Sequence, residues 1–230
     1  MEEQKVNKNK FADVPIRVKS WGVIILIFTV ALLHPVLMCL FVCFLSFQGL
    51  KEFIAMFSSL RNRKTYYILC VLIVPLSMVH LVFIGELNIP TQNIRGINAL
   101  ILLVLLTELN DVFQYLSGKF FGKKKITPRI SPNKTWEGFL GGLVLTIGFA
   151  NLLSFYLLPD KGFVLYSIMG LLIGVFGFCG DIYISSIKRY AGVKDTGNLI
   201  PGHGGLLDRI DSLLFITPVY YWLLYLMYIY

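Results

Sequence analysis

Charged residues are scarce in this chain of 230 residues: lysine, arginine, aspartate and glutamate together make up only 15% of it. Soluble domains carry about 25% charged residues. The shortage leaves little room for a soluble domain and, with 56% hydrophobic residues, indicates an integral membrane protein. The first apolar run begins near Trp21, after a charged tail, and has no small-residue cleavage site. We therefore do not expect a signal peptide joined to a soluble body.

Cysteine is rare as well, and several common motifs are missing. The four cysteines all lie in apolar runs, and none forms a CxxC pair. Such buried thiols are typical of small packing side chains, so we expect neither a disulfide nor a metal site among them. The sequence has no internal repeat, no low-complexity tract and no GxxxxGK[ST] motif. Any phosphate site must therefore be of another kind than a P-loop.

Apolar runs long enough to cross a bilayer recur along the chain. A span needs about 20 apolar residues, or somewhat fewer if it is short or re-entrant. We predict an all-α fold, a polytopic membrane bundle of about seven transmembrane helices. The predicted spans are 20–33, 36–57, 66–85, 97–118, 139–158, 163–184 and 213–230.

Basic residues are distributed unevenly over the predicted loops. If the loops alternate between the two sides of the membrane, 19 of the 21 lysines and arginines fall on the side of the N-terminus. Only Arg95 and Lys161 fall on the other side. The positive-inside rule then places the N-terminus and the basic loops in the cytoplasm. The net charge of +8 therefore favours a lipid bilayer over a nucleic acid as partner, and the apolar composition fits a bacterial inner membrane.

Acidic residues recur near the cytoplasmic ends of the later spans. Asp208 and Asp211 are three apart and share a helix face, Asp181 ends the preceding span, and Glu108 and Asp111 lie in the fourth. Converging carboxylates repel one another, and a hard divalent cation such as Mg²⁺ removes that repulsion. The predicted metal ligands are Asp181, Asp208 and Asp211. The alternative is that these aspartates form structural salt bridges with nearby basic residues.

Basic side chains and glycines surround these acids. Lysine and arginine bind phosphate oxygens, and glycines such as Gly204 and Gly205 let backbone N–H groups approach an anion closely. His203 between them either binds phosphate or only holds the loop. The preceding loop adds hydroxyls and a lysine in SPNKTWEG, where Thr135 is the expected N-cap of the next helix. These residue types predict a metal-dependent phosphate site at the lipid boundary.

Four glycines on the sixth span, at spacings of four and three, form one small-residue face; they are Gly170, Gly174, Gly177 and Gly180. Such a face lets a neighbouring helix approach closely. We therefore expect Asp181, which follows this face directly, to lie near the carboxylates of a neighbouring helix.

The segment before the last span resembles the signature of phosphatidate cytidylyltransferases, also called CDP-diacylglycerol synthases. The matching residues are Ser185, Lys188, Arg189, Lys194, Asp195, Gly197, Ile200, Pro201, His203, Gly204, Gly205, Asp208, Arg209 and Asp211. SPNKTWEG and NDVFQYLSGKFFGK are similar to two further blocks of that family, so the resemblance covers about residues 108–215. The chain departs from the family at Ile184, where many members are acidic, and in Asp111-Val-Phe-Gln-Tyr115, usually Asp-Thr-x-Ala-Tyr.

The resemblance implies transfer of CMP from CTP to phosphatidate, giving CDP-diacylglycerol and pyrophosphate. The residues implied in catalysis are Lys188, Arg189, Lys194, Asp195, His203 and Arg209. The residues implied in substrate binding are Asp111, Ser131, Lys134, Thr135, Ser185, Gly204 and Gly205. The resemblance also adds a second, monovalent ion such as K⁺ to the expected Mg²⁺, and it leaves a homodimer open.

The resemblance also suggests a division of the chain. Residues 1–96 hold the tail and three spans, and residues 97–230 form a catalytic membrane domain with cytoplasmic loops 119–138 and 185–212. Two other functions stay open: an enzyme acting on another lipid, such as a related cytidylyltransferase or kinase, and a transporter. A transporter would use Glu108, Asp111 and Asp181 as intramembrane sites and is typically built from inverted repeats, which this sequence lacks.

Overall fold

Seven helices make up most of the part of the chain that this computed structural model describes, which is residues 14–57, 63–89, 94–159, 162–201 and 204–229. The helices are α2 (Val14–Ala31), α3 (Pro35–Phe57), α4 (Arg63–Glu86), α5 (Gly96–Phe121), α6 (Trp136–Leu157), α7 (Phe163–Tyr190) and α8 (Leu207–Ile229). Each predicted span overlaps one of them, and the expected all-α class is confirmed.

Two short antiparallel hairpins interrupt the helices. One pairs β1 (Asn88–Ile89) with β2 (Ile94–Arg95). The other pairs β3 (Lys125–Thr127) with β4 (Ser131–Thr135), so that Lys125 lies opposite Thr135 and Thr127 opposite Ser131. The second hairpin occupies the first predicted cytoplasmic loop, which therefore has a fixed shape.

Four of the described helices are long and apolar enough to cross a membrane by length and composition: α3, α5, α6 and α7. Shorter apolar stretches lie in α2 and α4, at Lys19–Ala31 and Leu72–Glu86. Large apolar side chains are exposed on these helices, Phe47, Phe155 and Val164 among them. An apolar exterior over closed helical backbone is what hydrocarbon requires, so this is an integral membrane protein.

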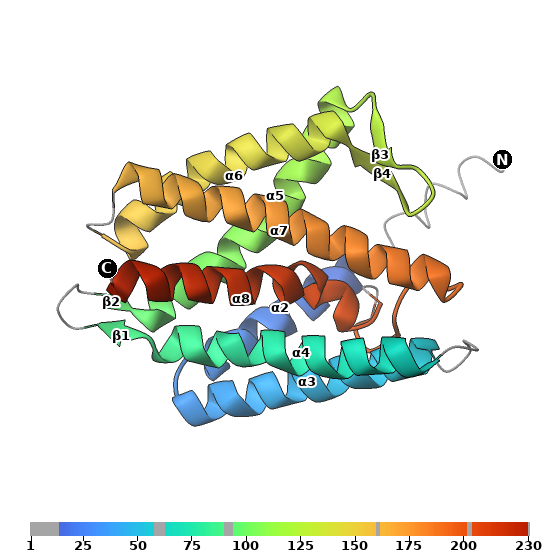
Figure 1. The fold of residues 1–230 in the computed structure, drawn as a ribbon, viewed down its shortest axis with the longest axis horizontal. Coiled ribbons are helices and arrows are strands. Elements are labelled where there is room, and N and C mark those ends of the chain that lie inside the picture. The colour runs from blue at the N-terminus through green and yellow to red at the C-terminus, as the bar shows by residue number, and fades with distance from the viewer. Residues whose placement is uncertain (1–13, 58–62, 90–93, 160–161, 202–203, 230) are drawn as a thin grey trace.

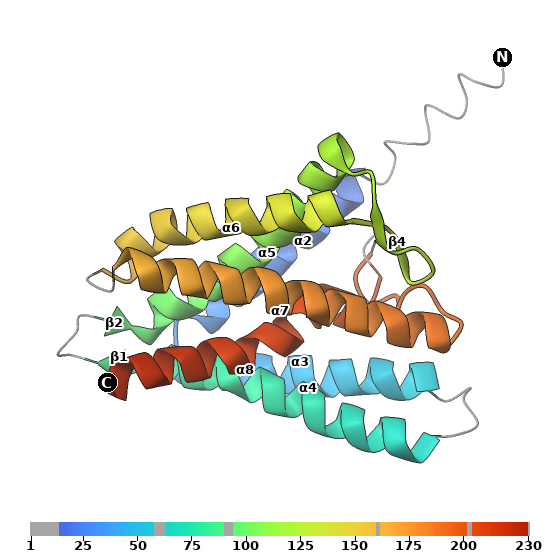
Figure 2. The same cartoon turned by 45° about the horizontal axis from the view of Figure 1, so that its top comes forward.

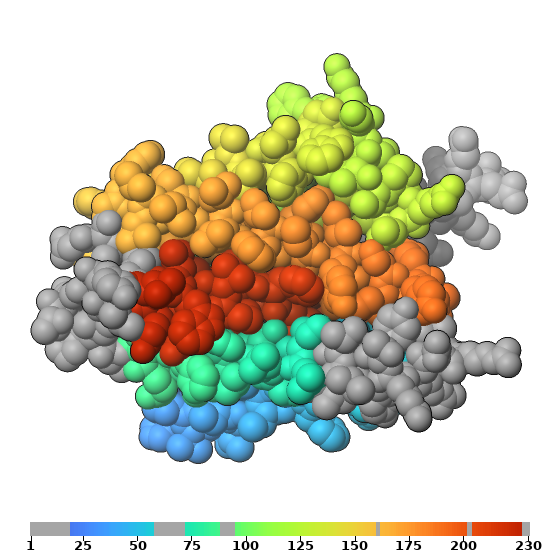
Figure 3. Space-filling view, viewed as in Figure 1, coloured from blue at the N-terminus to red at the C-terminus, as the bar shows by residue number. Residues whose placement is uncertain are grey.

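The helices lie side by side along the long axis of the molecule. From the top of Figure 1 downwards, α6, α7, α8, α4 and α3 follow one another, with α5 and α2 behind them. Figure 3 shows the same order as a continuous face of the molecule. In the turned view of Figure 2 the β3–β4 hairpin still lies beside the carboxyl end of α7, from which the chain folds back towards the start of α8. Two segments distant in sequence thus meet at one end of the bundle.

Small residues on α7 determine how closely its neighbours approach. A Cβ atom on Gly170 would lie 2.8 Å from the Cβ of Ala150 on α6, and one on Gly180 would lie 2.6 Å from the backbone oxygen of Asp211 on α8. The predicted small-residue face is therefore confirmed as a packing surface. Its last glycine brings Asp181 beside the acidic first turns of α8.

The second predicted loop is shorter than expected, because helix continues into both of its ends. The helix α7 runs on to Tyr190, and α8 already begins at Leu207. Ser185 and Lys188, three apart, form part of the buried face of α7, and burial of that face accounts for the extra turns. Gly192, with a φ of 75°, then turns the chain out of α7.

Candidate functional site

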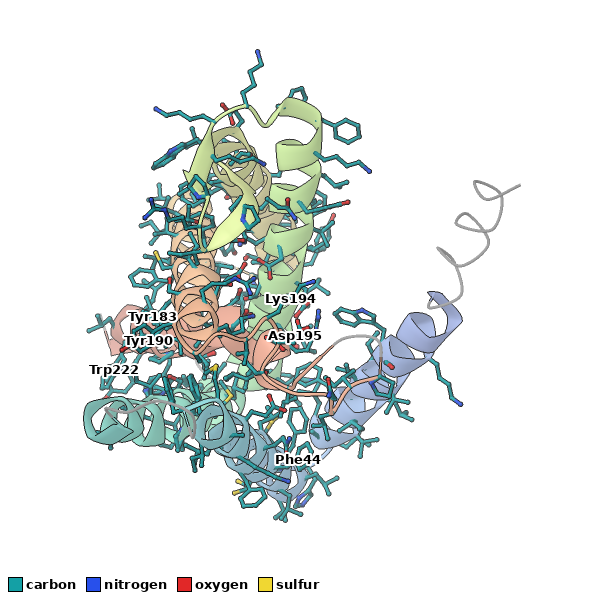
Figure 4. The ribbon with its side chains drawn as sticks, turned by 90° about the vertical axis from the view of Figure 1, so that its right-hand side faces the viewer. Phe44, Tyr183, Tyr190, Lys194, Asp195 and Trp222 are labelled. Atoms are coloured by element: carbon teal, nitrogen blue, oxygen red, sulfur yellow. The ribbon has the colours of Figure 1, made fainter. Side chains whose placement is uncertain are left out.

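Eight charged side chains line one cavity of about 330 Å³. They are Asp111 on α5, Lys134 on β4, Asp181 and Lys188 on α7, Asp195 in the loop that follows, and Asp208, Arg209 and Asp211 on α8. The three predicted metal ligands therefore face a common space, although they come from two helices. Figure 4 looks onto this end of the molecule, where Lys194 and Asp195 lie near the centre of the view.

Asp208 is held by donors on both of its oxygens. Its Oδ1 accepts from Lys188 Nζ at 2.7 Å, and its Oδ2 accepts from the backbone N–H groups of Thr196 at 2.9 Å and Gly205 at 3.0 Å. Both charged side chains are largely buried. The segment between α7 and α8, here called the glycine loop, thus directs its backbone N–H groups at a carboxylate of the protein itself, that of Asp208. Asp208 ties α7, the loop and the first turn of α8 together.

Two glycines are required where the loop enters α8. Gly204 has a φ of 86°, in the left-handed region that suits glycine. A Cβ atom on Gly205 would lie 2.1 Å from Thr196 Oγ1 and 2.5 Å from Glu52 Oε2, closer than real atoms approach. The loop therefore closes only with glycine at position 205.

We expect Gly205→Ala to displace the loop and to lower turnover by at least about 10-fold, because buried charged hydrogen bonds of this kind contribute about 1.5–3 kcal/mol each. The matched control is Gly148→Ala on α6, where an added Cβ meets nothing within 4 Å. Thermal unfolding and turnover of both purified variants, compared with wild type, check this. Equal values for the two variants would contradict the close packing at Gly205.

Three other carboxylates keep oxygens directed at the cavity. Asp181 forms an ion pair with Lys134 and accepts from Ser185 Oγ at 3.2 Å. Asp211 Oδ1 accepts from the backbone N–H of Ser212 at 2.9 Å. Asp111 Oδ1 is buried and has no hydrogen-bond partner among the described residues. A buried carboxylate oxygen without a donor is costly, so this atom is an open acceptor within the site.

Lys134 supplies positive charge from the β3–β4 hairpin. Its ammonium group pairs with Asp181, lies 3.4 Å from Gln114 Oε1 and sits 5.1 Å from the centre of the Phe178 ring. Burial lowers the pKa of Lys134, but the charges of Asp181 and Asp111 outweigh burial, and the pKa lies above its ordinary value. Lys134 is therefore protonated at neutral pH and offsets part of the acidic charge.

The hairpin that carries Lys134 is fixed at its ends. Thr135 is the N-cap of α6, as expected, and accepts from the backbone N–H of Gly138 at 3.1 Å. Glu137 accepts from the backbone N–H groups of Lys123 at 2.9 Å and Lys124 at 3.1 Å. These contacts set the position of β4 relative to α6, and hence the reach of Lys134.

The other predicted site residues that the structure describes are not among those that line the cavity. Arg189 donates to the backbone oxygens of Ile130 and Val193, both at 3.1 Å, and so joins the hairpin to the loop. Ser131 is part of β4, and Lys194 is exposed. His203 lies outside the described residues, so the two roles predicted for it stay predictions.

Glu52 on α3 also contacts the site loop, although no sequence motif marked this residue. This side chain is buried and accepts hydrogen bonds from the loop and from the start of α8. The available signal was an acidic residue inside a predicted span, which is costly and usually functional. Its position near the end of that predicted span is also typical of an ordinary interfacial residue.

The cavity carries more negative than positive charge, with five carboxylates against three cations. Within the described part of the chain, no three acidic, histidine or cysteine side chains are close enough to form a complete metal-ligand set. Mg²⁺ usually needs only one or two protein carboxylates, because water and substrate phosphates complete its coordination. The excess of carboxylates and the open Asp111 oxygen fit such a partial cation site.

Comparison with known proteins places this site within a family. The profile of the Cytidylyltransferase family matches residues 62–227, which include every residue that lines the cavity. The chain belongs to the cytidylyltransferase family. This membership agrees with the resemblance carried by the loop before α8.

Several relatives of this cytidylyltransferase-family chain are similar to it over different lengths. The uncharacterized protein YnbB of Escherichia coli is 36% identical over 95% of this chain and 89% of its own length. A phosphatidate cytidylyltransferase of Bacillus subtilis is 45% identical over 50% of this chain, and one of Staphylococcus haemolyticus is 37% identical over 63%. These alignments span 42% and 55% of the two phosphatidate cytidylyltransferases, so the chain matches about half of each.

Proposed function

We propose that this protein transfers CMP from CTP to phosphatidate, releasing pyrophosphate. A phosphate oxygen of the lipid attacks the α-phosphorus of CTP. The bond from the α-phosphorus to the oxygen that bridges it to the β-phosphorus breaks, and that oxygen leaves with pyrophosphate. The observation that carries the proposal is the mixed acidic and basic cavity, built from the segments that match the family. The names of the relatives in Bacillus subtilis and Staphylococcus haemolyticus support phosphatidate as the lipid.

The nucleophile in this reaction needs little activation. The second pKa of a phosphate monoester is about 6, so the lipid phosphate is already largely anionic at neutral pH. The chemistry therefore depends on bringing two polyanions together and on stabilising charge on the leaving pyrophosphate. Arg209 suits that task, because it lines the cavity and a guanidinium can hold phosphate oxygens with two hydrogen bonds. Lys194, which is exposed beside the site, would contact the phosphates of the nucleotide as it enters the cavity.

A cavity rich in carboxylates would repel CTP unless cations are added. We propose that Asp111, Asp181 and Asp211 together bind Mg²⁺ and K⁺, each ion through only one or two of these carboxylates with water and substrate phosphates as its other ligands, while Asp208 holds the loop. Bound Mg²⁺ would supply charge stabilisation to the phosphates. Asp111 contributes an oxygen with no partner among the described residues, and Lys134 keeps Asp181 oriented. This assignment replaces Asp208 with Asp111 in the predicted ligand set, because donors already occupy both oxygens of Asp208.

The site must be open to water for CTP and to lipid for phosphatidate. We propose that all seven helices cross the membrane and that the cavity faces the cytoplasm, as the distribution of basic residues predicts. The bacterial relatives favour the inner membrane of a bacterium. In this arrangement Ser131, Thr135 and the glycine loop border the substrates, and Ser185 orients Asp181.

The proposal predicts that purified protein with CTP and phosphatidate releases pyrophosphate in the presence of Mg²⁺. Excess EDTA should abolish this release, and added Mg²⁺ should restore it, because the carboxylates would otherwise repel the triphosphate. The measurement is coupled detection of pyrophosphate together with chromatography of the lipid product. Release with another lipid phosphate but not with phosphatidate would indicate a related lipid enzyme. No release with any lipid phosphate would overturn the proposal.

A further inference from the structure

A buried acid on α3 reaches the site loop from outside the part of the chain that matches the family. Glu52 lies ten residues before the matched segment 62–227, and only about 5% of it is exposed. Among the described residues, none of its hydrogen-bond partners is a side chain that lines the cavity. The partners of its carboxylate show what it holds in place.

Both oxygens of Glu52 accept hydrogen bonds from the segment that ends the loop. Oε1 accepts from the backbone N–H of Leu206 at 2.9 Å, and Oε2 accepts from the backbone N–H of Leu207 at 2.9 Å. Thr196 Oγ1 lies 2.8 Å from Oε2, and Gln48 Nε2 lies 3.0 Å from Oε1. These two backbone groups stand at the start of α8, where N–H groups have no partner within the helix and where negative charge is favoured. Glu52 therefore caps α8 from another helix.

Thr196 links the hydrogen bonds of Glu52 to those of Asp208. Thr196 Oγ1 lies 3.1 Å from Asp208 Oδ2 as well as 2.8 Å from Glu52 Oε2. Gly205, whose N–H donates to Asp208, leaves no room for a Cβ atom against Glu52. One small region thus joins α3, the loop and the first turn of α8. A shift of Glu52 would move the turn that presents Asp208 and Asp211 to the cavity.

A second contact holds the same loop from the N-terminal side. Ser20 on α2 donates to the backbone oxygen of Pro201 at 2.9 Å. In Figure 4 the loop labelled by Lys194 and Asp195 lies between α5 and α7 on one side and α2 and α3 on the other. The helices α2 and α3 therefore both contact the loop between α7 and α8.

We propose that Glu52 is a positioning residue for the transfer reaction: it holds the loop and the first turn of α8 in the geometry that the cavity needs. The inference rests on the proposed function, and it adds the N-terminal helices to the functional unit. Glu52 touches no reacting atom in this proposal. Its effect passes through the backbone of Leu206 and Leu207 to the aspartates that follow.

The decisive variant is Glu52→Gln, which keeps the shape of the side chain. An amide has one oxygen only, so its NH₂ group would face an N–H donor at Leu206 or Leu207. We expect kcat to fall by at least about 10-fold, and amide hydrogen exchange across residues 204–208 to speed up by a similar factor, because a charged hydrogen bond at a buried site is lost. Glu52→Asp keeps the carboxylate and should retain more activity than Glu52→Gln.

The control is Glu86→Gln, the same chemical change at an exposed position at the end of α4. All variants are purified as the full chain, and kcat is divided by the fraction of protein that elutes as one folded species. A merely packing role predicts that the isosteric Glu52→Gln is tolerated better than the shorter Glu52→Asp. That order, or wild-type exchange in Glu52→Gln, or wild-type kcat with faster exchange, would overturn the inference.

Should Glu52→Gln fail to assemble, Thr196→Val decides, since it removes one donor and adds no charge. Wild-type kcat and exchange in that variant would overturn the inference, and lower kcat with faster exchange across 204–208 would support it. The exchange measurement needs no substrate. If the wild type releases no pyrophosphate, the proposed reaction fails, and exchange alone still decides whether Glu52 holds the loop.

Discussion

Replacing Asp211 with asparagine is expected to abolish turnover while leaving the fold intact. Asp211 is buried and lines the cavity together with Asp111 and Asp181. Asparagine keeps the oxygen that accepts from the N–H of Ser212, but it removes the charge that a cation would meet. Loss of an outer-shell partner of a metal typically costs 10–100-fold, so loss of a direct ligand should lower kcat by more than about 100-fold.

The same substitution should not destabilise the metal-free protein. Neighbouring carboxylates in a buried site repel one another, and removing one charge relieves that repulsion. We therefore expect the midpoint of thermal unfolding in EDTA to stay constant or to rise, and stabilisation by added Mg²⁺ to disappear. Differential scanning fluorimetry with and without Mg²⁺ measures both effects. Wild-type kcat, or wild-type stabilisation by Mg²⁺, would remove Asp211 from the proposed ligand set.

Asp208→Asn is expected to behave differently, losing both activity and stability. Lys188 occupies one oxygen of Asp208, and two backbone N–H groups occupy the other. In either orientation the amide NH₂ would face a donor, and the buried Lys188 would lose its counter-ion. Removing one partner of a buried pair typically costs about 3–5 kcal/mol. The unfolding midpoint should fall by several degrees or more, because each kcal/mol corresponds to about 2–4 °C in a chain of this size.

A double variant separates the cost of leaving Lys188 without a counter-ion from the cost of removing the acceptor that holds the loop. Lys188→Met combined with Asp208→Asn removes the unpaired cation, so the double variant should be more stable than the sum of the single effects predicts. Turnover should stay low, because the loop still lacks its central acceptor. An Asp208→Asn protein with the wild-type unfolding midpoint would show that Asp208 does not hold the loop. Asp208 would then return to the set of candidate metal ligands.

The part of the site that follows from local pattern could be predicted from sequence. The spacing of glycines on α7 predicted a close helix contact, because every third or fourth residue of a helix lies on one face. Thr135 was recognisable as an N-cap, since its type and position before an apolar run are local features. The density of charge between two apolar runs marked the loop before α8. Each of these inferences needs only neighbours in sequence.

The roles of individual acids could not be predicted in the same way. Their positions three apart on one helix face do not distinguish Asp208 from Asp211. Only the folded loop shows that the backbone N–H groups of Thr196 and Gly205 donate to Asp208. The family resemblance implied a substrate-binding role for Asp111, but its place beside the acids of α8 follows from the packing of α5 against α8, which no local pattern predicts. These assignments depend on where donors lie in space.

The sequence by itself determined a membrane-embedded helical protein with a charged site before its last helix, because hydrophobic length and helical periodicity are properties of contiguous residues. Only the tertiary structure decided which carboxylate holds the loop, which carboxylates face the cavity, and that Glu52 belongs to the same unit. Glu52 is separated from its hydrogen-bond partners Leu206 and Leu207 by 154 and 155 residues. A contact at that separation exists only after the helices have packed.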